Sequence, residues 1–106
     1  MAITSVKGVL DQIQHVDPSK IKGLNAVILF DLTGQGGGQW TATLADGTVN
    51  VEEGKKGTPN MTLSMAATDF VAMANGELNA MAAFMQGKIR ISGDMSLAMR
   101  LQNILA

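Results

Sequence analysis

The chain has 106 residues, no cysteine and a formal net charge of −1. A chain of this length forms one domain, residues 1–106, with a modest fraction of buried surface. The absence of cysteine excludes disulfides and thiolate metal sites. Lysine and arginine are scattered along the sequence, which predicts no basic face for nucleic acid or anionic lipid.

The beginning of the chain, MAITSVKGVLDQIQHVDPSK, has no positively charged start followed by an apolar block. No secretory signal is therefore predicted. Charged and polar residues interrupt the apolar stretch between residues 66 and 86, which argues against a membrane span. We expect a soluble protein that stays in the cytoplasm.

The first predicted element is a helix, because apolar residues recur at intervals of three and four. They lie on one helical face: Ile3, Val6, Val9, Leu10, Ile13 and Val16. The single histidine, His15, follows near the helix end, where it caps carbonyls or faces solvent. Asp17 and Pro18 provide an N-cap and a first-turn proline for a short second helix that Gly23 ends.

Alternating patterns then predict four strands, over residues 26–33, 39–44, 48–51 and 61–65. The glycine-rich stretch TGQGGGQW joins the first two as a hairpin loop; no helix follows it, so it is not a phosphate cradle. Asp46 and Gly47 predict a tight turn. We expect these four strands to form a β-meander.

Three helical segments and a fifth strand complete the chain. Thr68 is expected to cap a helix that includes Phe70, Asn79 to cap residues 80–86, and Asp94 to cap the final helix. Residues 88–92 alternate as a strand. The pattern predicts an α+β fold, in which a five-stranded, mostly antiparallel sheet has helices packed on one face.

The final helix has more apolar surface than docking requires. Successive residues of a helix are about 100° apart around its axis. The polar stripe covers roughly 60° of that circle and consists of Ser96, Arg100 and Asn103, whereas apolar residues cover about 220°. A docked helix needs only about 100°. Gln102 interrupts the apolar arc, either as a buried amide bonded to the backbone or as a group that holds the polar end of a ligand.

The segment FMQGKIRISGDMSLAMRLQNI resembles the C-terminal signature of the sterol carrier protein 2 family. That signature is a phenylalanine, a Gly-Lys pair, an alternating strand, a Gly-Asn or Gly-Asp turn and a Leu-Ala-x-Lys/Arg-Leu-Gln helix. Upstream, MTLSMAATDFVAMANGELN and GGGQWTATLADGTV are similar to the family's preceding segments. The resemblance covers nearly the whole chain and implies a stand-alone, prokaryotic member of the family.

The resemblance implies a protein that binds and transfers lipid in a hydrophobic tunnel between the sheet and the C-terminal helices. The ligand would be a fatty acid, fatty acyl-CoA, phospholipid or sterol. Methionine suits such a lining because it repacks around different shapes; filling a core is the alternative for the methionines and for Trp40. The implied lining is Phe30, Trp40, Phe70, Met73, Met81, Phe84, Met85, Met95, Met99, Gln102 and Leu105.

The chain departs from the family pattern at two places. Ala80 and Met81 replace a Pro-Gln or similar polar pair, which leaves the head-group preference open. The chain ends in Ile-Leu-Ala and lacks the peroxisomal Ser/Ala-Lys-Leu tripeptide, which again favours the cytoplasm.

No constellation for catalysis is visible. Glu52 and Glu53 are adjacent on a strand and should point to opposite sides. We therefore expect no enzyme activity, no metal and no cofactor. The alternative function is a regulatory or structural domain that takes a partner helix in the same groove. The expected partner is a lipid, with transient membrane contact, for a protein that is a monomer or at most a dimer.

Overall fold

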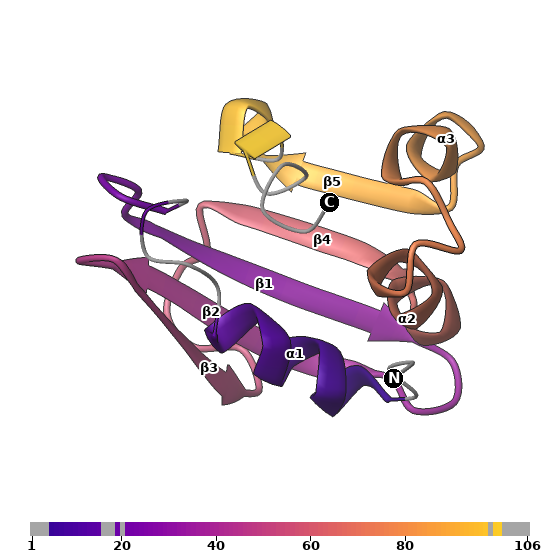
Figure 1. Ribbon diagram of the computed structural model, residues 1–106, viewed down its shortest axis with the longest axis horizontal. Helices are drawn as coiled ribbons and strands as arrows, with labels where there is room; N and C mark the ends of the chain where they lie inside the picture. Colours follow the sequence, from indigo (N-terminus) through magenta and orange to yellow (C-terminus); the bar gives the residue numbers. More distant parts are fainter. Residues whose placement is uncertain (1–4, 16–18, 20, 98, 101–106) are drawn as a thin grey trace.

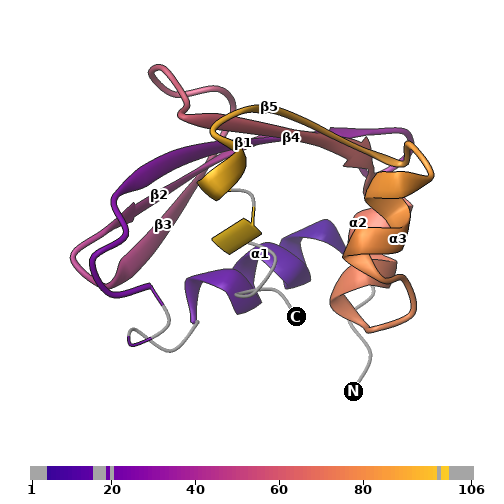
Figure 2. The same cartoon turned by 90° about the horizontal axis from the view of Figure 1, so that it is seen from above.

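A computed structural model describes residues 5–15, 19, 21–97, 99 and 100. It shows a curved sheet with the helices on one face (Figure 1, Figure 2), which is the predicted α+β fold. Residues 95–97, 99 and 100 are also helical and are called the final helical turn. The elements are α1 (Val6–Gln14), β1 (Ala26–Thr33), β2 (Gly38–Ala45), β3 (Thr48–Glu53), β4 (Met61–Ala66), α2 (Ala67–Ala74), α3 (Ala80–Met85) and β5 (Ile89–Gly93).

The five strands have the order β3-β2-β1-β4-β5. Neighbours are antiparallel except β1 and β4, which run parallel. The predicted meander is correct for β1 to β3 and wrong for β4. The reason is composition: β1 is apolar on both faces and suits the centre of the sheet, whereas β3, with Asn50, Glu52 and Glu53, suits an edge.

The strand register places apolar residues of neighbouring strands side by side on the face that carries the helices. Phe30 lies opposite Trp40 on β2 and beside Leu63 on β4, and Leu63 in turn pairs with Ile91. Helix α1 covers part of this face, and its predicted apolar stripe is confirmed within the described residues; Ile3 and Val16 lie outside them. The buried residues of α1 are Val6, Val9, Leu10 and Ile13.

The loop from Gly54 to Asn60 connects β3 to β4 across the outer face of the sheet, opposite the helices (Figure 2). Thr41 holds its start, because its hydroxyl donates to the carbonyl of Gly54 (2.7 Å) and accepts from the N–H of Lys56 (2.9 Å). Asn60 holds its end through two hydrogen bonds with the backbone of Val27. We call residues 54–60 the crossover loop.

The predicted turns agree with the backbone. Asp46 (φ 54°) and Gly47 (φ 76°) are both left-handed, as a two-residue hairpin turn requires. The glycine-rich stretch forms the loop between β1 and β2. Gly23, with φ 76°, is the third residue of a turn in which the N–H of Leu24 donates to the carbonyl of Ile21. Asp17 and Pro18 lie outside the described residues.

Of the four predicted N-caps, Asp17 lies outside the described residues and two of the other three are confirmed. The Asn79 side chain accepts from the N–H of Ala82, and the Asp94 carboxylate accepts from the N–H groups of Ser96 and Leu97. The Thr68 prediction is wrong, because α2 begins at Ala67 with Ala66 at the N-cap and no side-chain cap. Strand β4 leads directly into α2, so no capping residue separates them.

Candidate functional site

The face of the sheet under the helices holds a buried layer built around two aromatic rings. Phe30 of β1 and Phe70 of α2 are fully buried, with ring centroids 5.5 Å apart and ring planes inclined by 56°. A tilted contact of this kind is a favourable aromatic pairing. It attaches α2 to the central strand.

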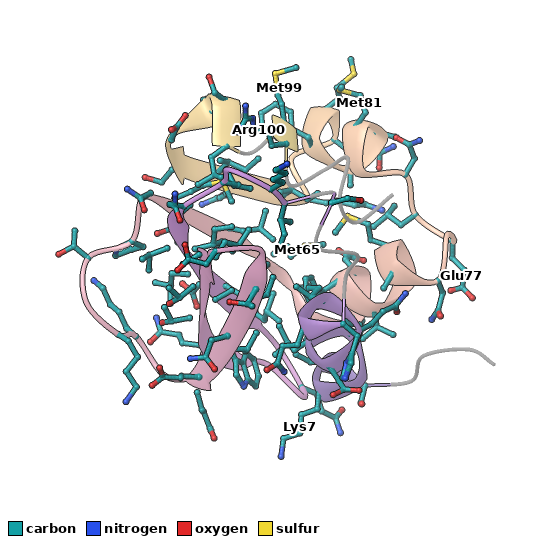
Figure 3. The ribbon with its side chains drawn as sticks, turned by 60° about the vertical axis from the view of Figure 1, so that its left-hand side comes forward. Lys7, Met65, Glu77, Met81, Met99 and Arg100 are labelled. Atoms are coloured by element: carbon teal, nitrogen blue, oxygen red, sulfur yellow. The ribbon has the colours of Figure 1, made fainter. Side chains whose placement is uncertain are left out.

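Trp40 and Met73 are half-buried and pack against the same layer. The indole ring of Trp40 lies against Gly38, where an added Cβ would come within 3.1 Å of the ring. The inward row of β4 and β5 also lies here, and Figure 3 shows Met65 in the middle of the molecule. Strand alternation identifies this row, but the predicted lining omitted it: Met61, Leu63, Met65, Ile89 and Ile91.

The buried layer is chemically uniform. Among the residues that the structure describes, Thr41 is the one buried polar side chain, and it lies on the outer face with the crossover loop. No described buried side-chain nitrogen or oxygen lacks a hydrogen-bond partner. The layer under the helices therefore offers an apolar environment without a fixed polar group.

Helix α3 places its large apolar side chains outside and a small one inside. Ala83 is fully buried, whereas Met81 is 51%, Phe84 42% and Met85 80% exposed. The final helical turn, at the opposite end of β5 from α3 (Figure 1), buries Leu97 but leaves Met95 49% and Met99 66% exposed. Met81 and Met99 project from the same side of the molecule (Figure 3). We call this set the methionine rim: Met81, Phe84, Met85, Met95 and Met99.

The predicted lining residues thus fall into two groups. Phe30 and Phe70 are in the buried layer with Trp40 and Met73 at its margin, and the rim residues are exposed on α3 and the final helical turn. Gln102 and Leu105 lie outside the described residues. Helical spacing identified all the apolar positions but not which of them face solvent. Their role in lining a tunnel remains a prediction.

Titratable groups do not converge on this layer. His15 is exposed, and its Nδ1 lies 2.8 Å from the carbonyl oxygen of Asp11, one turn earlier. Its predicted position at the helix end is therefore confirmed. Glu52 pairs with Thr41 and Glu53 with Trp40, which places the two carboxylates on opposite faces, as predicted. Within residues 5–15, 19, 21–97, 99 and 100, no three His, Cys, Asp or Glu side chains form a group that could hold a metal ion.

These features define the class of protein: an α+β domain with a mixed five-stranded sheet, an apolar layer under its helices and an apolar rim at one edge. The chain belongs to the SCP-2 sterol transfer family, whose profile matches residues 6–106.

Curated relatives contain this domain as one part of a longer protein. Sterol carrier protein 2 of Gallus gallus is 34% identical over 103 residues, which is 92% of this chain and 18% of that protein. Hydroxysteroid dehydrogenase-like protein 2 of Homo sapiens is 37% identical over 86 residues, which is 80% of this chain and 21% of that protein. The chain therefore spans about a fifth of the length of these relatives.

Solved structures give the same fold. The solution structure of palmitated SCP2L2 from Aedes aegypti has a TM-score of 0.81 and 27% identity, covering 96% of this chain and 95% of that one. The sec-alkylsulfatase Pisa1 from Pseudomonas sp. has a TM-score of 0.80 at 16% identity, covering 96% of this chain and 16% of that one; this likeness concerns the fold alone. The family, the sterol carrier protein 2 relative and the Aedes aegypti structure support lipid binding and transfer as the function of the domain.

Proposed function

We propose that the protein is a non-catalytic lipid carrier that holds a hydrocarbon chain between the helix-bearing face of its sheet and the helices. The observation that carries this proposal is the uniform apolar character of that layer, since the one buried polar side chain among the described residues lies on the opposite face. The palmitated state of the Aedes aegypti relative supports a long acyl chain as the ligand.

Hydrocarbon burial supplies the affinity in this proposal. Each methylene group moved out of water contributes about 0.8 kcal/mol, so a long chain binds well without a polar contact. For the same reason the head group contributes less to the affinity than the hydrocarbon does, and fatty acid, fatty acyl-CoA, phospholipid and sterol all remain in the ligand class.

We propose that the protein acts as a monomer in the cytoplasm. Within the described part of the chain, no helix is long and apolar enough to cross a bilayer.

The test is calorimetric titration with saturated fatty acids of ten to eighteen carbons. We expect the affinity to rise by up to about fourfold per methylene group until the site is full. A matched pair of ligands sharpens the test: 12-hydroxystearate should bind about tenfold or more weakly than stearate, because its mid-chain hydroxyl would be buried without a partner.

A flat dependence on chain length, or equal binding of the hydroxylated acid, would contradict the proposal. Both results would instead favour a groove that takes a partner helix. Native mass spectrometry of the gently purified protein separates the two functions directly, because a carrier retains co-purified lipid and an interaction domain does not.

A further inference from the structure

We propose that the methionine rim is a site of reversible oxidation. Peroxides convert its four thioethers to sulfoxides without unfolding the protein, and a thiol-dependent reductase converts them back. Lipid binding plays no part in this chemistry, which depends on the sulfur atoms that solvent can reach. The sulfur-bearing residues of the rim are Met81, Met85, Met95 and Met99.

Methionine is distributed unevenly between the surface and the core. In the described part of the chain, four of the five large apolar side chains that are exposed are methionines. Among the 21 buried apolar residues of the same part, two are methionines, Met61 and Met65. Leucine at the rim would give a similar apolar surface without sulfur. What the sulfur adds at an exposed position is a group that peroxides oxidise.

Solvent exposure divides the methionines into two sharply different classes. The rim methionines are between 49% and 80% exposed, whereas Met61 and Met65, in the buried layer, are 1% and 3% exposed. Figure 3 shows the sulfur atoms of Met81 and Met99 on the outside of the molecule and Met65 in its middle. Because oxidation follows exposure, the rim should react well before the buried layer.

No cysteine competes for the oxidant, since the sequence contains none. With hydrogen peroxide, the thioether sulfur attacks one peroxide oxygen, an S–O bond forms and the O–O bond breaks. The departing hydroxide takes up a proton and becomes water, so sulfur is oxidised by two electrons and the peroxide is reduced. In the reverse reaction two thiols of a methionine sulfoxide reductase become a disulfide, and the sulfoxide oxygen leaves as water.

The rim methionines form two pairs, and the members of each pair are one helical turn apart. The pairs are Met81 with Met85 on α3, and Met95 with Met99 on the final helical turn. The buried positions of these two segments are Ala83 and Leu97, which carry no sulfur. Oxidation therefore leaves the packing of both segments intact and makes an apolar surface polar.

The experiment treats the native full chain with hydrogen peroxide and follows each methionine by mass spectrometry, with the urea-unfolded chain as reference. Cleavage after glutamate separates the two classes of methionine before tandem sequencing assigns each sulfoxide. The rim methionines fall on fragment 78–106, and the remaining described methionines fall on fragment 54–77: Met61, Met65 and Met73.

We expect the rim methionines to react within about threefold of their rates in the unfolded chain. Met85 should be the fastest and Met99 the second, in the order of their exposure. Met61 and Met65 should react at least about tenfold more slowly than in the unfolded chain, because the buried layer excludes peroxide.

Hydrophobic-interaction chromatography measures the change of surface polarity. The rim-oxidised protein should elute earlier than the untreated protein, with a melting temperature within a few degrees of it. Methionine sulfoxide reductases for both sulfoxide epimers, supplied with dithiothreitol, should restore the original elution. The matched control keeps the apolar surface but removes the sulfur, so peroxide should not change its elution: Met81→Leu/Met85→Leu/Met95→Leu/Met99→Leu.

Three results would overturn the proposal. Rim methionines protected as strongly as Met61 and Met65 would show that the rim is covered in solution. Loss of native tryptophan fluorescence on oxidation of the rim alone would show that the modification unfolds the protein. An unchanged elution after treatment of the oxidised protein with the reductases would show that the modification is irreversible.

Discussion

At the scale of single residues, Thr41 shows how one hydroxyl can fix a long connection. It is buried on the outer face of β2 and bonds both the carbonyl of Gly54 and the N–H of Lys56. These two bonds hold the start of the crossover loop against the sheet. The loop must reach β4 on the far side of β1, so its path depends on this contact.

Replacing Thr41 by valine should destabilise the protein by about 1 to 3 kcal/mol, because two backbone groups of the loop lose their partner. Urea denaturation followed by tryptophan fluorescence measures the change. The matched control is Thr43→Val, on the same face of the same strand but exposed, which should stay within about 0.5 kcal/mol of wild type. Equal effects of the two substitutions would show that the hydrogen bonds of Thr41 contribute nothing special.

Residue identity predicts burial well on strands and poorly on short helices. On β4 the alternation of side chains fixes which residues face the core, and Met61, Leu63 and Met65 are buried as their pattern indicates. On α3 nearly every residue is apolar, so the sequence offers no polar face to mark solvent. That Ala83 is inside and Met85 outside depends on how the helix docks beside β5, which is a tertiary property.

At the scale of elements, helix ends were predictable where a capping side chain decides them. Asn79 and Asp94 both cap as expected, since each side chain can satisfy N–H groups that the first turn leaves unpaired. Thr68 does not, because the chain passes from β4 into α2 without a break. The strand order also escaped prediction, since alternation identifies a strand but not its neighbours.

Substituting Asn79 by alanine should loosen α3 by about 1 kcal/mol, because Ala82 loses the acceptor for its N–H. Hydrogen exchange of the Ala82 amide, measured by NMR, should accelerate roughly fivefold, the factor that about 1 kcal/mol represents. Asn79→Asp retains a capping oxygen and should restore slow exchange. Thr68→Ala removes a side chain that caps nothing, so amide exchange in α2 should change little.

At the scale of the whole molecule, ligand binding and folding stability are linked. A ligand that binds only the native state stabilises it by about 2.7 kcal/mol at one hundred times its Kd. For a domain of this size, each 1 kcal/mol shifts Tm by roughly 4–8 °C. Palmitate at that concentration should therefore raise Tm by about 10–20 °C in scanning calorimetry.

Hexadecanedioate is the control for that measurement. It has the same length but a carboxylate at each end, so one charge would have to enter the apolar layer. It should shift Tm far less than palmitate, since burying an unpaired charge is strongly unfavourable. Equal shifts by the two acids would contradict burial of the chain end.

The parallel pairing of β1 with β4 has a consequence for synthesis on the ribosome. The central strand β1 ends at Thr33, but its second neighbour, β4, ends only at Ala66. At about 5–20 residues per second, some two to seven seconds separate the completion of the two strands. During that interval one long edge of β1 is unpaired, with Ile28, Phe30 and Leu32 beside it. The nascent chain is therefore most exposed to aggregation before β4 arrives, and a ribosome-bound chaperone would act on this intermediate and not on the finished domain.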